Sequence, residues 1–190
     1  DHRDLHVRSR RQRQMCIRDR YFDNVEVPLE NMLVPGGSFG KLMDAFDLER
    51  CGNTTMSLAL AQSAFDYVLN YSQERVQFGK PLIDFQAVQI QLAEMKMKLE
   101  AARLLLYRAV VNAESGLPSI GESSVAKCFA NEAVREVTGK AMQIMGGYGY
   151  SKEFDIERYY RDAPLLAIGE GTNELQKLII AKQLLARHPV

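Results

Sequence analysis

Residues 85–110 read F-Q-A-V-Q-I-Q-L-A-E-M-K-M-K-L-E-A-A-R-L-L-L-Y-R-A-V, and this stretch decides the fold class. Its apolar side chains recur every three or four residues, which places them on one face of a helix. That face consists of Phe85, Val88, Leu92, Met95, Leu99, Ala102, Leu106 and Val110. Such a long stripe is typical of the core of a helical bundle rather than of a cofactor site. Asp84 is predicted to cap the helix, and Gly116-Leu117-Pro118 ends the run.

Two more segments show the helical period. The first is predicted to begin after a cap at Ser38 and to end near Gln73. Its inner positions are Phe39, Leu42, Met43, Phe46, Ala61, Ala64, Phe65, Val68 and Leu69. The second is predicted from Ser124 to about Met145. Its inner positions are Ala126, Phe129, Ala130, Ala133, Val137, Ala141, Ile144 and Met145, and the alanines favour a close approach of helices.

Two shorter helices complete the predicted fold. One is expected over residues 154–162, and a last helix begins after Thr172 or Asn173, either of which can cap it. Its inner face is expected to consist of Leu175, Leu178, Ile179 and Leu185. The helix count and the short connections predict a mostly α protein, a four-helix up-and-down bundle over residues 38–188.

The residues before the bundle fall into two parts. Within residues 21–34, apolar and polar side chains alternate briefly before Pro28, which predicts an extended segment and a turn. Pro35-Gly36-Gly37 then forms a linker, so residues 21–37 are expected to precede the bundle as a separate piece.

The head of the chain, residues 1–20, carries seven arginines and three aspartates. Such a basic arm could contact nucleic acid or an acidic membrane, or it could be a targeting peptide. Residues 7–20, V-R-S-R-R-Q-R-Q-M-C-I-R-D-R, look instead like a translated sequencing-adapter read. We therefore assign this head no function, expect it to be poorly ordered, and expect no nucleic-acid partner.

Composition excludes several classes of protein. Apolar residues make up 46% of the chain and charged residues 25%, as in an ordinary globular protein. No apolar run approaches the roughly 18 residues of a membrane span, so no membrane insertion is expected. Cys16, Cys51 and Cys128 lie far apart, in no metal or redox spacing, which predicts no metal site.

One carboxylate stands out near the end of the chain, in the stretch A-P-L-L-A-I-G-E-G-T-N-E-L-Q at 163–176. Glu170 lies between Gly169 and Gly171, which allow a sharp turn and the close approach of another molecule. A carboxylate held on a tight loop beside free backbone N–H groups suits a general base that acts on a carbon acid. The alternative interpretation is a surface loop that ends in a capped helix.

The segment D-L-E-R at 47–50 offers a second set of charges. Asp47 and Arg50 are three residues apart and share a helix face, where a solvated ion pair is one interpretation. Glu49 is a second candidate base, and a solvated helix face is the alternative.

One of two glycine-containing connections between helices could bind an anion. Arg75 could pair with a pyrophosphate, because a guanidinium matches phosphate oxygens in a two-pronged way. A plain helix-to-helix connection over residues 75–82 is the alternative. Residues 146–150, G-G-Y-G-Y, break a helix and do not form a dinucleotide fingerprint, since no strand precedes them.

Five motifs together carry a resemblance to a known family. They are R-V-Q-F-G-K-P-L at 75–82, F-Q-A-V-Q at 85–89, M-Q-I-M-G-G-Y-G-Y at 142–150, R-D-A at 161–163 and E-G-T at 170–172. In this order and spacing, residues 21–188 resemble the C-terminal part of an acyl-CoA dehydrogenase. Residues 21–28 resemble the end of that family's middle β-domain.

The resemblance implies a flavin-dependent oxidoreductase. Glu170 would remove an α-proton from an acyl-CoA thioester, FAD would accept the β-hydrogen as hydride, and a trans-2-enoyl-CoA would form. Electrons would pass to an electron-transfer flavoprotein. D-L-E-R resembles the isovaleryl-type branch, in which the base lies at the position of Glu49. Related alternatives are an acyl-CoA oxidase, an enoyl-CoA reductase or a non-catalytic helical assembly module.

The resemblance also assigns binding residues. Contacts to the FAD of a neighbouring subunit would come from Arg75, Gln77, Phe78, Gln86, Gln143, Gly146 and Gly147. Thr172 and Glu174 would lie near the flavin. Asp47 and Arg50 would lie at the mouth of the acyl-CoA site, with Gly169 and Gly171 beside the substrate.

Further expectations follow from the same resemblance. The family commonly has tyrosine at the position of Gly169, so this chain leaves room for a branched, cyclic or dicarboxylic acyl group. The shared FAD sites imply a homodimer or a dimer of dimers. Location in a bacterial cytoplasm is favoured over the mitochondrial matrix. Residues 1–190 alone are expected to bind FAD poorly and to be inactive.

Overall fold

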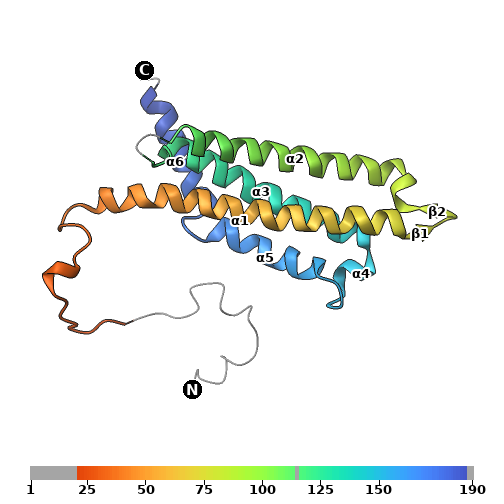
Figure 1. Ribbon diagram of the computed structural model, residues 1–190, viewed down its shortest axis with the longest axis horizontal. Coiled ribbons are helices and arrows are strands. Elements are labelled where there is room, and N and C mark those ends of the chain that lie inside the picture. The colour runs from red at the N-terminus through yellow and green to blue at the C-terminus, as the bar shows by residue number, and fades with distance from the viewer. Residues whose placement is uncertain (1–20, 114–115, 188–190) are drawn as a thin grey trace. The chain divides into compact units, whose positions relative to one another are not determined.

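The computed structural model describes residues 21–113 and 116–187 (Figure 1). The basic head predicted for residues 1–20 lies outside the described residues. The chain divides into two units, one that ends at Met43 and one that begins at Asp44. The described part of the first unit contains bends, turns, the 3-10 helix η3 (Leu29–Asn31) and the start of the first long helix, and no strand is assigned in it. A turn after Pro28 agrees with the prediction.

Helices dominate the rest of the chain. The elements in order are α1 (Phe39–Glu74), β1 (Val76–Gln77), β2 (Lys80–Pro81), the 3-10 helix η4 (Leu82–Asp84), α2 (Gln86–Val111), α3 (Ile120–Met145), α4 (Gly147–Tyr150), α5 (Ile156–Ile168) and α6 (Asn173–Arg187).

Helices α1, α2, α3 and α5 share one hydrophobic core, which lies in the second unit. Its buried members are Ala61, Ala64, Phe65, Val68, Leu92, Met95, Leu99, Val134, Val137, Ala141, Met145, Ile156, Ala163 and Leu166. Helix α3 packs against α2, α5 and α6 and is therefore the central helix. The predicted mostly α bundle is confirmed, and its core comes from the predicted stripes of three helices together with residues of α5.

Helix α2 begins differently from the prediction. Asp84 lies in η4, and Phe85 occupies the N-cap position without a capping side-chain bond. The predicted Asp84 cap is therefore wrong, because the chain makes a 3-10 turn before the α-helix starts. Two predicted inner residues, Phe39 of α1 and Val110 of α2, are exposed. Both lie at helix ends, at the start of α1 and the end of α2.

Helix α3 begins at Ile120, earlier than the predicted Ser124. Ser119 is the N-cap, and its Oγ accepts a hydrogen bond from the Glu122 backbone N–H at 3.3 Å. Serine followed three residues later by glutamate is a recognised helix-start pattern. The prediction overlooked this pattern.

Helix α5 extends well beyond the predicted end at Asp162. It continues through Pro164 to Ile168, and it buries Ala163, Leu166 and Ala167. Proline lacks the N–H that an interior helical position would use. Here the burial of the apolar residues that surround Pro164 outweighs this loss.

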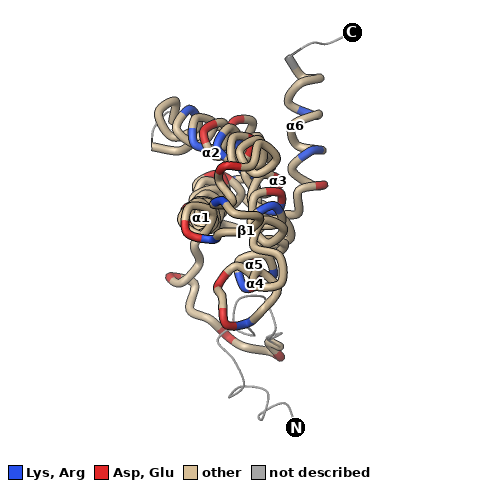
Figure 2. Tube along the Cα trace, turned by 90° about the vertical axis from the view of Figure 1, so that its right-hand side faces the viewer, with Lys and Arg blue, Asp and Glu red and all other residues tan. Residues whose placement is uncertain are grey.

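The predicted inner face of α6 is wrong. Leu175, Leu178 and Leu185 are exposed, and Leu178 has 68% of its surface accessible. The buried residues near the start of α6 are Asn173 and Gln176. Figure 2 views the bundle along its helices and shows that α6 crosses them at a steep angle. Helix α6 therefore packs through polar side chains at its start rather than through a leucine stripe.

The connection between α1 and α2 is a small hairpin. Strands β1 and β2 are antiparallel, and Val76 pairs with Pro81. Phe78 and Gly79, at its tip, both have positive φ, +52° and +81°. Two consecutive residues with positive φ match the twist of a two-residue hairpin turn. The turn leaves the Phe78 ring 94% exposed.

Candidate active site

Glu170 lies on the loop between α5 and α6. Helix α5 closes with a hydrogen bond from the Gly169 N–H to the Leu165 carbonyl oxygen at 2.8 Å. Gly169 has an ordinary φ of −68°, whereas Glu170 and Gly171 have φ values of +56° and +86°. The sharp turn expected of both glycines therefore falls on Glu170 and Gly171. A non-glycine residue with positive φ is strained, and strain of this kind concentrates at functional sites.

Gly171 and Thr172 complete the turn into α6. A Cβ on Gly171 would lie 2.8 Å from Nε2 of Gln176, so a side chain here would displace the Gln176 amide in addition to straining the backbone. The Leu175 N–H donates to Oγ1 of Thr172 at 3.3 Å, which confirms the predicted cap. Glu174 lies in the first turn of α6, where a negative charge is favourable.

A buried lysine of α3 supports the loop through hydrogen bonds. Lys127 of α3 has no accessible surface. Its Nζ donates to the Gly171 carbonyl oxygen at 2.9 Å and to the Leu166 carbonyl oxygen at 3.3 Å. These two carbonyl groups lie on either side of Glu170 in the sequence.

Buried amides extend this support. The Leu166 carbonyl oxygen also accepts from Nδ2 of Asn131 at 2.8 Å and from Nδ2 of Asn53 at 3.3 Å. Asn131 further donates to Oδ1 of Asn173 at 3.1 Å and accepts from Oγ of Ser57 at 2.6 Å. The loop is thus fixed by side chains from α1, α3 and α6.

The environment of Glu170 shifts its proton affinity. Burial raises the pKa of this carboxyl, and the nearby charge of Glu49 raises it further. The charge of Lys127 and a hydrogen bond with Asn53 oppose the rise in this pKa. Oε2 of Glu170 is buried and has no hydrogen-bond partner among the described residues. A carboxylate in such surroundings is a better base than an exposed one.

Asp47 and Arg50 form a buried ion pair. Their accessible fractions are 7% and 5%, and a hydrogen bond joins Arg50 Nη1 to Asp47 Oδ1. Oγ of Ser123, on α3, donates to the same Asp47 oxygen at 3.2 Å. The solvated-pair interpretation is therefore wrong, because α3 covers this face of α1. Burial raises the pKa of Asp47, and the charge of Arg50 opposes this.

Glu49 does not share the burial of this pair. It is exposed, and it lines a groove of about 400 Å³ between α1 and α2. The groove is lined by Leu48, Glu49, Cys51, Gly52, Thr55, Leu106, Tyr107 and Val110. Its charge nevertheless raises the pKa of Glu170, so the two candidate bases influence each other electrostatically.

The hairpin and the glycine-rich turn meet at the other end of the bundle (Figure 1). The Arg75 guanidinium lies over the Tyr148 ring, 5.3 Å from its centroid. This contact brings residues 75–78 next to residues 143–147. The predicted cofactor residues exposed at this end are Gln77, Phe78, Gln86, Gln143, Gly146 and Gly147.

The two groups of predicted residues do not come together within one chain. Within α3, Lys127 bonds the Glu170 loop, and the helix ends at Met145, next to Gly146. At about 1.5 Å of rise per residue, it separates these two positions by roughly 28 Å. Thr172 and Glu174 belong to the Glu170 end, whereas Arg75 and Gln143 belong to the hairpin end.

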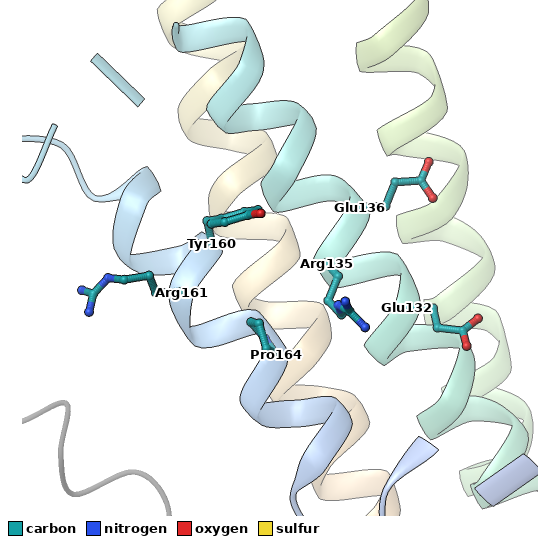
Figure 3. A pocket seen from close by; sticks show the side chains of 6 residues that line it. All are labelled: Glu132, Arg135, Glu136, Tyr160, Arg161 and Pro164. Carbon is teal, nitrogen blue, oxygen red and sulfur yellow. The ribbon is translucent and has the colours of Figure 1, made fainter. Parts of the chain in front are cut away.

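A second hollow lies between α3 and α5 (Figure 3). It has a volume of about 740 Å³ and is lined by Glu132, Arg135, Glu136, Tyr160, Arg161 and Pro164. Its charges are mixed, and no residue predicted for the site lines it. It therefore adds nothing to the chemistry of Glu170.

The sequence contained a signal for the buried support that the prediction overlooked. Ser123, Lys127 and Asn131 recur every four residues on the buried side of α3, among apolar neighbours. Polar residues in the buried stripe of a helix require partners, so such a row indicates a polar network.

The described part of the chain holds neither a candidate metal-ligand cluster nor a helix suited to span a membrane. No cluster of three or more metal-ligating side chains occurs among residues 21–113 and 116–187. In the same part of the chain, no helix combines the length and the apolar character that crossing a bilayer requires.

The fold and the loop define a class of protein: a helical domain that presents a half-buried carboxylate before its last helix. Residues 39–185 match the family model "Acyl-CoA dehydrogenase, C-terminal domain", and the chain belongs to this family. The family inferred from the sequence motifs is thereby confirmed.

Several relatives are similar over most of the chain. The short-chain specific acyl-CoA dehydrogenase of Megasphaera elsdenii is 43% identical over 165 residues, which are 86% of this chain and 43% of that protein. The mitochondrial short-chain enzyme of Homo sapiens is 41% identical over 86% of this chain and 40% of its own length. Subunit CarC of the caffeyl-CoA reductase-Etf complex of Acetobacterium woodii is 41% identical over 89% and 45%.

The fold has counterparts among solved structures. Butyryl-CoA dehydrogenase from Megasphaera elsdenii superposes with a TM-score of 0.83 at 42% identity, over 86% of this chain and 43% of that chain. The chain therefore spans less than half the length of these relatives.

Proposed function

We propose that the complete protein is an acyl-CoA dehydrogenase. It converts an acyl-CoA thioester into a trans-2-enoyl-CoA, with Glu170 as the base that removes the α-proton. The observation that carries this proposal is the state of Glu170, a partly desolvated carboxylate with positive φ on a loop held by buried donors. Family membership supplies the reaction class.

The residues of the loop suit this step. An α-proton beside a thioester is weakly acidic, so the base must be strong and the developing negative charge on the thioester oxygen must be stabilised. The raised pKa of Glu170 strengthens the base. Its backbone N–H is the donor that we assign to the thioester oxygen. The support from α3 keeps both groups on one rigid turn.

FAD, when bound, would supply the acceptor for the β-hydrogen and its electron pair. Residues at both ends of the bundle fit this cofactor. Thr172 and Glu174 lie beside the Glu170 turn. At the hairpin end, Arg75 can pair with a pyrophosphate, and the exposed Phe78 ring offers an apolar surface against which a bound cofactor could pack.

The separation of these groups supports an oligomer. Gln143, Gly146 and Gly147 lie with Arg75 at one end of α3, roughly 28 Å from the Glu170 end at about 1.5 Å per residue. We infer that the two ends serve two different FAD molecules. The protein would then be a homodimer or a dimer of dimers, in which the hairpin of one subunit reaches the cofactor of its neighbour.

Gly169 is the residue to which we assign selection of the acyl group. A Cβ at this position would lie 3.3 Å from the Leu165 carbonyl oxygen, so a side chain would need a shift of only a few tenths of an ångström, and no other contact within 4 Å would oppose it. The missing side chain leaves space beside the substrate, which favours a branched, cyclic or dicarboxylic acyl group. Asp47 and Arg50 would lie at the mouth of this site.

The electron partner proposed is an electron-transfer flavoprotein, in a bacterial cytoplasm. The similarity to CarC, whose name places it in a reductase-Etf complex, supports this partner and keeps enoyl-CoA reduction as a second candidate. Rapid oxidation of the reduced flavin by oxygen would indicate an oxidase instead.

A spectroscopic experiment tests the proposal. The complete flavoprotein is mixed anaerobically with a panel of straight, branched, cyclic and dicarboxylic acyl-CoA thioesters. Loss of flavin absorbance together with formation of the trans-2-enoyl product supports the proposal. A flavoprotein that no acyl-CoA bleaches contradicts it, and preference for straight chains contradicts the specificity assigned to Gly169.

A further inference from the structure

Lys127 is a buried charge that the reaction as proposed does not use. Among the fully buried side chains of the described residues it is the largest. Lysine is almost never fully buried, because moving an ammonium out of water is costly without partners. Its presence in the interior of α3 therefore requires a specific reason.

The bonds of Lys127 give that reason. Its ammonium joins the Leu166 carbonyl, in the last turn of α5, to the Gly171 carbonyl, in the turn before α6. Asn131 bonds only the first of these oxygens and Gln176 only the second. In the part of the chain that the structure describes, Lys127 alone bonds both.

We propose that Lys127 is a positioning residue for Glu170, whose ammonium ties together the two ends of the loop and so fixes the direction of the carboxylate. The inference rests on the proposed function, since it concerns the residue assigned there as the base. Because the strained φ of Glu170 is held between two bonded carbonyls, loss of the ammonium lets the turn relax and moves the carboxylate.

The charge of Lys127 has a second effect. It lowers the pKa of Glu170 and thereby opposes the contributions of burial and of Glu49 from α1. Arg50 from α1 and Cys128 from α3 are the other ionisable groups that act on Lys127. A neutral amide could hold the same carbonyls without this effect. The lysine therefore supplies position and charge together.

The test uses the complete flavoprotein and the acyl-CoA that bleaches the wild type fastest. We expect Lys127→Met to reduce its flavin 10- to 100-fold more slowly at neutral pH, since a misplacement of about 1 Å can cost about 100-fold. We also expect the low-pH limit of the rate to move to higher pH, because removal of the positive charge raises the pKa of Glu170.

A matched control separates this role from general support of the fold. Nζ of Lys98 lies 2.8 Å from Oε2 of Glu136 and joins α2 to α3. Lys98→Met therefore also removes an inter-helix bond, and it should keep the wild-type rate and pH dependence. If Lys127→Met does not retain FAD, Lys127→Gln replaces it. Its amide can still bond a carbonyl of the loop, so the criterion is then the move of the low-pH limit to higher pH, which follows from the lost charge alone.

Each other outcome overturns the inference. A wild-type rate in Lys127→Met would show that the loop needs no lysine. A slower rate with an unmoved pH dependence, or loss of FAD from both Lys127 variants, would show a merely structural role. A wild type that no acyl-CoA bleaches would refute the proposed function, and the inference with it, before any variant is compared.

Discussion

Nζ of Lys127 lies 2.9 Å from the carbonyl oxygen of Gly171, the residue directly after Glu170. The two residues are 44 positions apart in the sequence, and the contact joins α3 to the turn before α6. Glu49, from α1, acts on the same carboxylate with the opposite sign, because it raises the pKa of Glu170 whereas Lys127 lowers it. The pKa of Glu170 is therefore raised first by burial and then adjusted by groups from two helices outside its own loop.

Glu49→Gln should move the pH dependence in the opposite direction from Lys127→Met. Loss of a negative charge lowers the pKa of Glu170, so the base stays ionised to lower pH and the low-pH limit of flavin reduction moves down. The measurement is the rate of anaerobic flavin reduction as a function of pH in the complete protein.

Glu94→Gln serves as the control, because Glu94 is a carboxylate on α2 that pairs with Lys140. Its pH dependence should match the wild type. If the low-pH limit of flavin reduction stays in place or moves up in Glu49→Gln, Glu49 does not raise the pKa of the base.

Gly171→Ala should lower the free energy of unfolding by about 1–2 kcal/mol, because left-handed backbone costs a side-chain-bearing residue that much. The close approach of Gln176 adds to the cost, since the new Cβ would lie 2.8 Å from Nε2. Thermal unfolding of the complete protein measures the effect. Gly169→Ala is the matched variant, and with φ of −68° it should cost clearly less. Equal losses in both would contradict the turn geometry.

Asp47→Ala tests the buried pair. It leaves the Arg50 guanidinium buried without its carboxylate, which typically costs about 3–5 kcal/mol. Asp155→Ala removes an exposed partner of Arg158 and should cost at most about 1 kcal/mol. Denaturant unfolding of the two variants of the complete protein gives both values. A small loss in Asp47→Ala would mean that the pair is solvated after all.

Phe78→Ala tests the hairpin end. The ring is 94% exposed in the single chain, so its removal should leave the bundle core intact. If it covers the cofactor of a neighbouring subunit, FAD should bind about 10-fold more weakly, corresponding to about 1.4 kcal/mol. Titration of the apoprotein with FAD measures this change. Tyr150→Ala, which removes another exposed aromatic ring at the same end, should bind FAD as the wild type does. Equal affinity in Phe78→Ala would contradict the shared-site arrangement.

Periodicity was sufficient to predict α1, α2 and α3, because each helix carries an apolar stripe that the core buries. It failed for α6, whose buried residues Asn173 and Gln176 are polar and gain their partners from other parts of the chain. It also missed the continuation of α5 through Pro164, since burial against α3 decides that helix more than local preference does.

The candidate site was predictable to a similar extent. The place of Glu170 on a turn and the cap of α6 at Thr172 follow from local turn chemistry. The burial of Asp47 depends on Ser123, 76 residues away, and no local pattern reveals it. Lys127 was within reach of sequence reasoning, because a charged residue in a buried stripe indicates a partner, but the identity of that partner required the fold.

The central claim is that Glu170 is the base, and one comparison tests it most directly. Anaerobic flavin bleaching by the best acyl-CoA is measured in the complete wild-type protein, in Glu170→Gln and in Glu49→Gln. Loss of a general base costs at least about 100-fold, so bleaching should all but disappear in Glu170→Gln and persist in Glu49→Gln. Bleaching that persists in Glu170→Gln and disappears in Glu49→Gln would contradict the claim and make Glu49 the base.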